Sequence, residues 1–157
     1  MQTITPFLWF DGKAEEAAKL YTSLFKNSRI ISMKYWGEGS PFPKDQVMMA
    51  TFELDGLQFH AFDAGPQFKF SEAMSLFVNC DTQEEIDYFW NALTADGGQE
   101  SMCGWLKDKF GVSWQIIPPQ LGWLADSDKA RAGRVMQAMM QMKKIIIADL
   151  QKAYDGK

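Results

Sequence analysis

The sequence predicts an α+β fold in which two βαβββ modules form a curled mixed sheet with a cup, followed by C-terminal helices. Three observations predict it. The segment that starts at Pro6 resembles the segment that starts at Ser75 in its order of apolar and polar residues. Each leads into an amphipathic helix and then into runs of β-branched and aromatic residues, which favour strands. After Pro118 and Pro119, the composition changes to Met, Ala, Gln, Lys and Arg.

The helices of the two modules match. Glu15-Glu16 falls on Glu84-Glu85 at an offset of 69 residues, in what would be the first helical turn. Apolar residues then recur at helical spacing: Ala17, Leu20, Tyr21 and Leu24 in the first module, and Ile86, Phe89, Trp90 and Leu93 in the second.

Strand signals follow each helix. Asp55-Gly56 predicts a two-residue hairpin, and residues 56–62 match residues 111–117 at an offset of 55. The predicted strands cover residues 29–36, 47–54 and 57–63 in the first module, and residues 99–105 and 112–118 in the second. We expect one domain, 1–157, with a first module over 1–66, a second over 73–118 and a helical extension over 119–157.

The extension carries a stripe of apolar residues at helical spacing, which needs a partner surface: Val135, Met139, Met142, Ile146 and Leu150. The β-branched run Ile145-Ile146-Ile147 could divide it into two helices. Residues 126–157 hold seven basic and four acidic residues, whereas the whole chain has a net charge of −4. Such a segment can dock onto a neighbouring subunit, and its interspersed aspartates argue against a nucleic-acid partner.

Composition excludes several other classes of protein. Hydrophobic residues make up 46% of the 157 residues and charged residues 23%, which excludes a disordered or fibrous chain. Cys80 and Cys103 form no CxxC motif and have no neighbouring His, so we expect neither a disulfide framework nor a zinc site. Cys103 is predicted to be a buried, inert thiol in a strand. The N-terminus resembles no signal peptide and no run approaches 18 apolar residues, so we expect a cytoplasmic protein without a membrane partner.

Four stretches carry a family resemblance: ITPFLWFDGKAEEAAKLY near the start, CDTQEEID at 80–87, CGWLKDKFGVSWQIIP at 103–118 and MQAMMQMKK at 136–144. On these stretches, the chain resembles the PhnB-like branch of the vicinal oxygen chelate (VOC) superfamily, whose relatives include glyoxalase I, extradiol dioxygenases and bleomycin-resistance proteins. Members are often labelled 3-demethylubiquinone-9 3-methyltransferase-like. The sequence does not support methyl transfer, because Gly37-Glu38-Gly39 lacks a third glycine and no helix follows it.

The resemblance implies a divalent metal in the cup, held by the first and last strands of each module, where it would polarise adjacent oxygens of a substrate. The corresponding positions are Pro6, His60, Ser75 and Gln115. Only His60 is a strong ligand, whereas such a site needs three or four His or carboxylate ligands. We therefore assign no metal ligands and leave the cofactor unknown, with a divalent metal as the open alternative.

His60 is the only histidine and the first catalytic candidate. Strand alternation puts its side chain on the same face as Gln58 and Phe62. It could be a half-buried histidine that hydrogen-bonds within the sheet. It could instead act in the cup as a general base or substrate-orienting group, because histidine titrates near neutral pH.

Five further residues join His60 as candidates for the ligand-binding cup: Gln115, Ser75, Trp36, Trp105 and Glu38. Gln115 could hydrogen-bond a ligand carbonyl or pair with a neighbouring side chain. Trp36, Trp105 and Trp114 could wall a pocket, although most aromatic residues in strands belong to the core. Glu38 lies in a Gly-rich loop of the kind that closes over ligands, where its carboxylate is a candidate replacement acid or ligand.

Three functions follow from this sequence. The first is a small-molecule-binding VOC-like protein that could be an enzyme, with lyase, isomerase or dioxygenase-like activity on a substrate with adjacent oxygens. The second is a non-catalytic protein that sequesters a compound, as the bleomycin-resistance relatives do, because an apolar aromatic cup needs no metal to bind. The third is a structural partner that acts through its C-terminal helices. The resemblance implies a homodimer, and the Met-rich stripe offers a surface for it.

Overall fold

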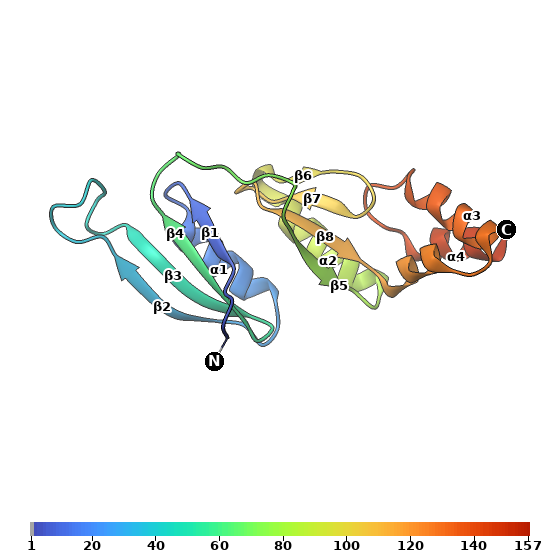
Figure 1. Ribbon diagram of the computed structural model, residues 1–157, viewed down its shortest axis with the longest axis horizontal. Coiled ribbons are helices and arrows are strands. Elements are labelled where there is room, and N and C mark those ends of the chain that lie inside the picture. The colour runs from blue at the N-terminus through green and yellow to red at the C-terminus, as the bar shows by residue number, and fades with distance from the viewer. Residues whose placement is uncertain (1) are drawn as a thin grey trace. The chain divides into compact units, whose positions relative to one another are not determined.

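The computed structural model describes residues 2–157 and divides into two compact units, one ending at Phe70 and the other beginning at Ser71. Each unit contains a four-stranded mixed sheet with one long helix packed on one face (Figure 1). The second unit also carries the C-terminal helices. The predicted fold class, with two βαβββ modules and C-terminal helices, is confirmed.

The first unit has the strand order β1-β4-β3-β2, in which β1 runs parallel to β4 and the other pairs are antiparallel. Asp55 and Gly56, between β3 and β4, both have positive φ, as a tight two-residue hairpin requires, so this prediction is confirmed. The elements are β1 (Phe7–Phe10), α1 (Ala14–Leu24), β2 (Arg29–Tyr35), β3 (Val47–Leu54) and β4 (Leu57–Asp63).

The second unit repeats this topology with the order β5-β8-β7-β6. Its elements are β5 (Ser75–Asn79), α2 (Gln83–Thr94), η1 (Ala95–Gly97), β6 (Gln99–Glu100), β7 (Trp105–Lys107) and β8 (Ser113–Ile117). The strand predicted over residues 99–105 is wrong in its extent, because the chain turns before β7. Cys103 and Gly104 have φ of +59° and +82° in this turn, so Cys103 does not lie in a strand.

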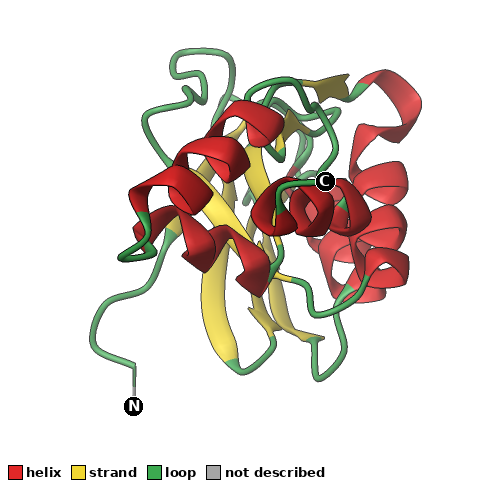
Figure 2. Cartoon of the chain, turned by 90° about the vertical axis from the view of Figure 1, so that its right-hand side faces the viewer, coloured by secondary structure: helices red, strands yellow, loops and turns green. Residues whose placement is uncertain are grey.

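The C-terminal extension consists of η2 (Pro119–Ala125), α3 (Lys129–Met139) and α4 (Ile147–Asp155), and the last two pack against each other (Figure 2). The predicted break at the isoleucine run is confirmed, because α4 begins at Ile147. The apolar stripe is therefore divided between two helices and their connection. Among the described residues, no helix is long and apolar enough to cross a membrane.

The core of each unit lies between the sheet and its helix. Alternate strand residues point toward the helix and are buried, as the two-residue period of a strand requires. The largest buried side chains of the two units are Tyr21 and Phe52 in the first, and Trp90, Trp114, Ile86 and Ile116 in the second. The remaining strand residues form an open face on the other side of each sheet.

The two long helices begin in different ways. Asp63, at the end of β4, is 2% exposed and accepts hydrogen bonds from the backbone N–H groups of Lys13 and Ala14 at 2.9 and 3.0 Å. It thus caps α1 from a distant strand, and its burial raises the pKa of the carboxyl. By contrast, α2 is capped locally, because Thr82 Oγ1 accepts from the Glu85 N–H at 3.2 Å.

Candidate functional site

Aromatic rings from β1, β4 and the flanking loops gather on one part of the open face of the first sheet. We call Phe7, Trp9, Trp36, Phe62 and Phe68 the aromatic face. Phe62 lies 5.5 Å from Phe7 and 5.2 Å from Trp9 between ring centroids, and Trp9 lies 4.9 Å from Phe68. Phe7 and Phe68 are 52% and 58% exposed, so these rings present a wide apolar surface.

His60 lies beside this aromatic face, with its ring centroid 6.3 Å from that of Phe7. Its Nδ1 shares a hydrogen bond of 3.0 Å with Oγ1 of Thr51, its partner across the β3–β4 ladder. Within the described chain, His60 Nε2 makes no hydrogen bond. The ring is thus held by the sheet through one nitrogen, while the other remains available to a ligand.

Trp36 and Glu38, two further cup candidates, lie after β2 at the start of the loop over residues 36–46. Trp36 stacks on Phe42 at 4.8 Å, lies 5.9 Å from Phe62, and donates from Nε1 to the carbonyl of Asp63. The loop is therefore fastened to the aromatic face through Phe42. Glu38 is exposed in this loop, without an ion pair or hydrogen bond among residues 2–157.

Gln115 and Ser75 lie together on the open face of the second sheet, where Gln115 Nε2 donates to Ser75 Oγ at 2.8 Å. The corresponding pair in the first sheet is also adjacent, because the His60 N–H donates to the Pro6 carbonyl at 2.9 Å. The four positions that the resemblance implies are thus paired inside each module.

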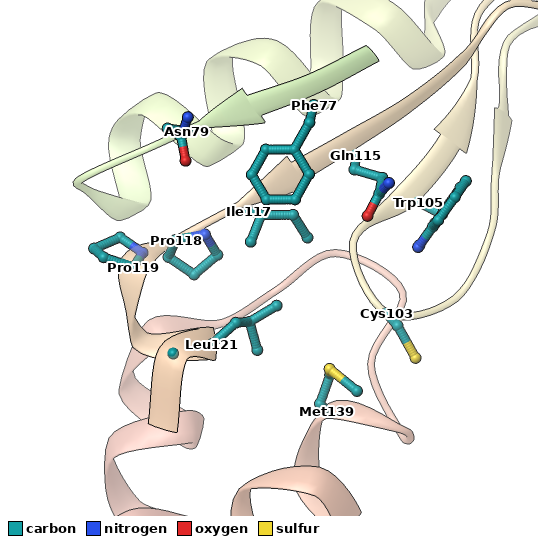
Figure 3. Close-up of a pocket in the computed structure, with 11 residues that line it drawn as sticks. Phe77, Asn79, Cys103, Trp105, Gln115, Ile117, Pro118, Pro119, Leu121 and Met139 are labelled. Carbon is teal, nitrogen blue, oxygen red and sulfur yellow. The ribbon is translucent and has the colours of Figure 1, made fainter. Parts of the chain in front are cut away.

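A pocket of about 430 Å³ lies on this second open face (Figure 3). One side comes from the strands: Phe77, Asn79, Trp105, Gln115 and Ile117. The other side comes from the segment after β8: Pro118, Pro119, Leu121, Gly122 and Met139. Cys103 completes the lining, which contains no charged side chain. Of the predicted cup residues, Trp105 and Gln115 line this pocket.

Trp114 and Cys103 differ from their predicted places. Trp114 does not wall the pocket, because it is buried on the helix side and donates from Nε1 to Asp108 at 2.9 Å. Cys103 lines the pocket and is only half-buried, so the prediction of a buried thiol is wrong. The buried cysteine is Cys80, and its burial raises the pKa of its thiol to about 12.

The C-terminal side of the pocket is fastened to the second sheet by backbone hydrogen bonds. The N–H groups of Cys103 and Gly104 donate to the carbonyls of Met142 and Lys143, both at 2.7 Å. The amide side chain of Gln83, on α2, adds two more bonds to this segment. It donates to the Ile145 carbonyl at 3.1 Å and accepts from the Ile147 N–H at 2.9 Å.

Sequence reasoning missed Leu121 and Met139 as pocket residues. Met139 belongs to the predicted apolar stripe, where methionine is expected to serve as core or interface. The only signal for its true place was that the stripe needed a partner surface. Its place depends on how the extension folds back onto the second sheet, through bonds between residues about forty positions apart, and no local pattern encodes this.

The side chains present do not fit a divalent metal in either unit. The nearest polar partner of His60 is the Thr51 hydroxyl, and that of Gln115 is the Ser75 hydroxyl. In the part of the chain that the structure describes, no three His, Cys, Asp or Glu side chains are grouped to hold a metal ion. Hydroxyl and amide oxygens alone are weak ligands for a divalent metal ion.

The chain is similar to a known protein family and to several solved structures. The family model described as 3-demethylubiquinone-9 3-methyltransferase matches residues 2–117. A solved structure of a putative 3-demethylubiquinone-9 3-methyltransferase, a PhnB protein from Bacillus cereus, is 44% identical with a TM-score of 0.70, covering 74% of this chain and 99% of that one. Protein PA1353 from Pseudomonas aeruginosa is 27% identical with a TM-score of 0.63, covering 75% of this chain and 98% of that one.

More distant relatives share the fold alone. The fosfomycin resistance protein FosX from Listeria monocytogenes, solved as a mutant with Mn(II), is 12% identical with a TM-score of 0.52, covering 74% of this chain and 92% of that one. No curated protein matches the chain. The chain therefore belongs to the 3-demethylubiquinone-9 3-methyltransferase family, the PhnB-like group, and has a VOC-like fold.

Proposed function

We propose that this chain binds a small, uncharged organic molecule in the pocket of its second unit. The observation that carries this proposal is the pocket lining of rings, apolar side chains and amides, without a charged group, around about 430 Å³. Ligand sites in proteins commonly enclose about 300–1,000 Å³ and combine apolar walls with a few placed polar groups. A charged ligand would gain no ion pair from these lining residues.

Gln115 supplies the placed polar group in this proposal. Its Nε2 is held by Ser75, which fixes the orientation of the amide. Its Oε1 makes no hydrogen bond within the described residues and can accept one from an N–H or O–H of the ligand. Phe77 and Trp105, on the same open face, offer apolar contact to the rest of the molecule.

We do not extend the activity in the family description to this chain. Gly37 and Gly39 lie in the loop between β2 and β3, and this loop does not lead into a helix that could bind a nucleotide-like cofactor at its N-terminus.

The proposal is tested by titrating the protein with N-phenylnaphthylamine, an uncharged dye with one N–H group. We expect saturable fluorescence enhancement at one dye per chain and binding weakened about tenfold by Gln115→Leu, since a buried hydrogen bond contributes about 1.5 kcal/mol. Gln137→Leu, on the exposed side of α3, is the matched control. Absence of saturable binding by the wild-type chain would contradict the proposal.

A second candidate function is catalysis at the aromatic face, supported by the His60–Thr51 pair. In this proposal, His60 Nε2 exchanges a proton with a substrate that carries adjacent oxygens. Because the chain has one histidine, its imidazole proton signals can be followed by NMR without assignment. Compounds of this class should shift these signals, and His60→Gln should abolish turnover while the fold is kept. Unshifted imidazole signals throughout the series would rule this candidate out.

We further propose a cytoplasmic homodimer. Two free cysteines suit a reducing compartment, and Met136 and Met140 are 42% and 57% exposed on α3, where a second chain could cover them. Light scattering should give twice the chain mass of 17.9 kDa. A mass of one chain at micromolar concentration would refute the dimer.

A further inference from the structure

The pocket is lined by two parts of the chain, and only the first of them is covered by the family model. The family model ends at residue 117, and the Bacillus cereus and Pseudomonas aeruginosa relatives cover 74% and 75% of this chain. Leu121, Gly122 and Met139 line the pocket from beyond that limit. The shared part of the fold therefore supplies the open face of the sheet, and the extension closes this face into a pocket.

The extension is a fixed wall rather than a loose tail. Four backbone groups of residues 142–147 are hydrogen-bonded to the β6–β7 turn and to Gln83. Ile145 is fully buried, and Lys144 forms an ion pair of 2.6 Å with Asp87 on α2. These points hold the segment that directly follows Met139, so the position of Met139 cannot adapt freely to a larger ligand.

We infer that the extension after residue 117 selects the ligand, that Met139 sets the size that the pocket admits, and that the ligand is a planar, uncharged ring compound with one amide-like group. This inference rests on the proposed function and specifies its ligand. Figure 3 shows Met139 across the pocket from the strand residues Phe77 and Gln115. A ring placed between them would contact the thioether on one side and the strand face on the other, and thioether sulfur packs favourably against aromatic rings.

The polarity of the lining narrows the ligand class. Gln115 offers one free acceptor and a second N–H on its amide, which together match a carboxamide. Asn79, at the rim, is exposed and does not compete with it. All other lining groups are apolar or weakly polar, so each further polar group on a ligand would lose its hydration without replacement.

The test compares two probes, a naphthalene carboxamide and an anthracene carboxamide, on the wild-type chain and on Met139→Ala and Met139→Phe. Binding is followed by the protection of Cys103 from a thiol reagent. Because Cys80 is buried and its thiol has a pKa of about 12, the folded chain should react at Cys103 alone. Gln137→Ala, at an exposed position of the same helix outside the pocket lining, is the matched control.

We expect Met139→Ala to shift the ratio of the two dissociation constants about tenfold toward the larger probe, and Met139→Phe to shift it in the other direction. A tenfold change is about what a methylene of pocket volume contributes to discrimination. Gln137→Ala should leave the ratio unchanged. Met139→Leu, which conserves volume, should keep the wild-type ratio and thus separates size from a general loss of folding.

Two results would overturn the inference. One is an equal ratio of the two carboxamide dissociation constants in the wild type and in the Ala, Phe and Leu variants of Met139, while the dye and the carboxamides still bind. The other is dye binding by the wild-type chain without protection of Cys103 by either carboxamide. The dye titration alone decides the proposed function, so its failure is distinguishable from the failure of Met139 as the size determinant.

Discussion

The two modules share their strand order and the placing of their long helix, yet they differ on the open face of the sheet. In the first module, this face carries exposed rings and His60. In the second, the corresponding face is lined by Gln115 and is closed by residues 118–139 into a pocket. The repeat thus specifies the scaffold, whereas the candidate site depends on the residues in which the two modules diverge.

The helix caps show the same divergence on a smaller scale. α1 depends on Asp63 at the end of β4, so the start of this helix is tied to the sheet. α2 depends on Thr82 directly before it, and Glu85 Oε2 also accepts from the Asp81 N–H at 2.8 Å. The first module therefore couples helix and sheet through a buried carboxylate, and the second relies on a local capping motif.

The largest expected effect on stability is at Gly104, where the second module meets its extension. A Cβ on Gly104 would lie 2.8 Å from Ile117 Cδ1 and 3.0 Å from the Ile116 carbonyl oxygen, at φ +82°. Gly111→Ala is the matched control, because Gly111 has φ +88° and open space around it. We expect Gly104→Ala to lower the free energy of unfolding by about 3 kcal/mol and Gly111→Ala by about 1 kcal/mol. Urea denaturation measures both, and equal losses would show that Gly104 does not lie against Ile116 and Ile117 as described.

The next effect separates the two caps. In the wild type, the Asp63 carboxylate accepts from two backbone N–H groups. In Asp63→Asn, the side-chain NH₂ group would face one of these N–H groups and leave it without an acceptor. We therefore expect the free energy of unfolding to fall by about 2 kcal/mol. Thr82→Ala should cost about 1 kcal/mol, the usual value for a local N-cap. Asp45→Asn, at an exposed turn residue, serves as the control. A larger loss for Thr82→Ala than for Asp63→Asn would show that the Asp63 cap of α1 does not stabilise the fold more than the local Thr82 cap of α2.

The smallest effect is a pH dependence specific to the second module. Trp90 Nε1 donates to Glu100 Oε1 at 2.9 Å, and this bond holds the pKa of Glu100 below its usual value. A carboxyl with a lowered folded-state pKa contributes stability above its unfolded-state pKa, and that stability is lost as the pH falls through the folded-state pKa. Glu100→Gln should therefore flatten the fall in melting temperature below about pH 5, whereas Glu38→Gln should not. An equal fall in melting temperature with pH for Glu100→Gln and the wild type would refute this prediction.

The scaffold could be predicted from sequence because it depends on local patterns. Apolar residues spaced three and four positions apart predicted both α1 and α2, and Asp55-Gly56 predicted the hairpin. The turn at Cys103 was missed because its backbone bonds go to Met142 and Lys143, about forty residues later in the chain. The same reason explains why Met139 was taken for core or interface rather than for a pocket wall.

The candidate site was only partly predictable for a related physical reason. Gln115 was found because it corresponds to a ligand position that the family resemblance implies, and Trp105 because it is a tryptophan in a predicted strand. Both line the pocket because they are cross-strand partners and share the open face. The burial of Trp114 on the other face follows from the same alternation, since it neighbours Gln115 in β8. Asp63 caps α1 from a distant strand. The matching position in the second module is Pro118, which has no side chain that could cap a helix. The repeat therefore could not reveal this role of Asp63.

The central claim is that the extension closes the second open face into the ligand site. The most direct test is an NMR titration of isotope-labelled protein with the naphthalene carboxamide, following the Gln115 amide, the Trp105 indole N–H and the Met139 methyl group. We predict saturable shifts at these three side chains, with His60 and the aromatic face unaffected. Shifts confined to His60 and the aromatic face, or no shifts at all, would contradict the claim.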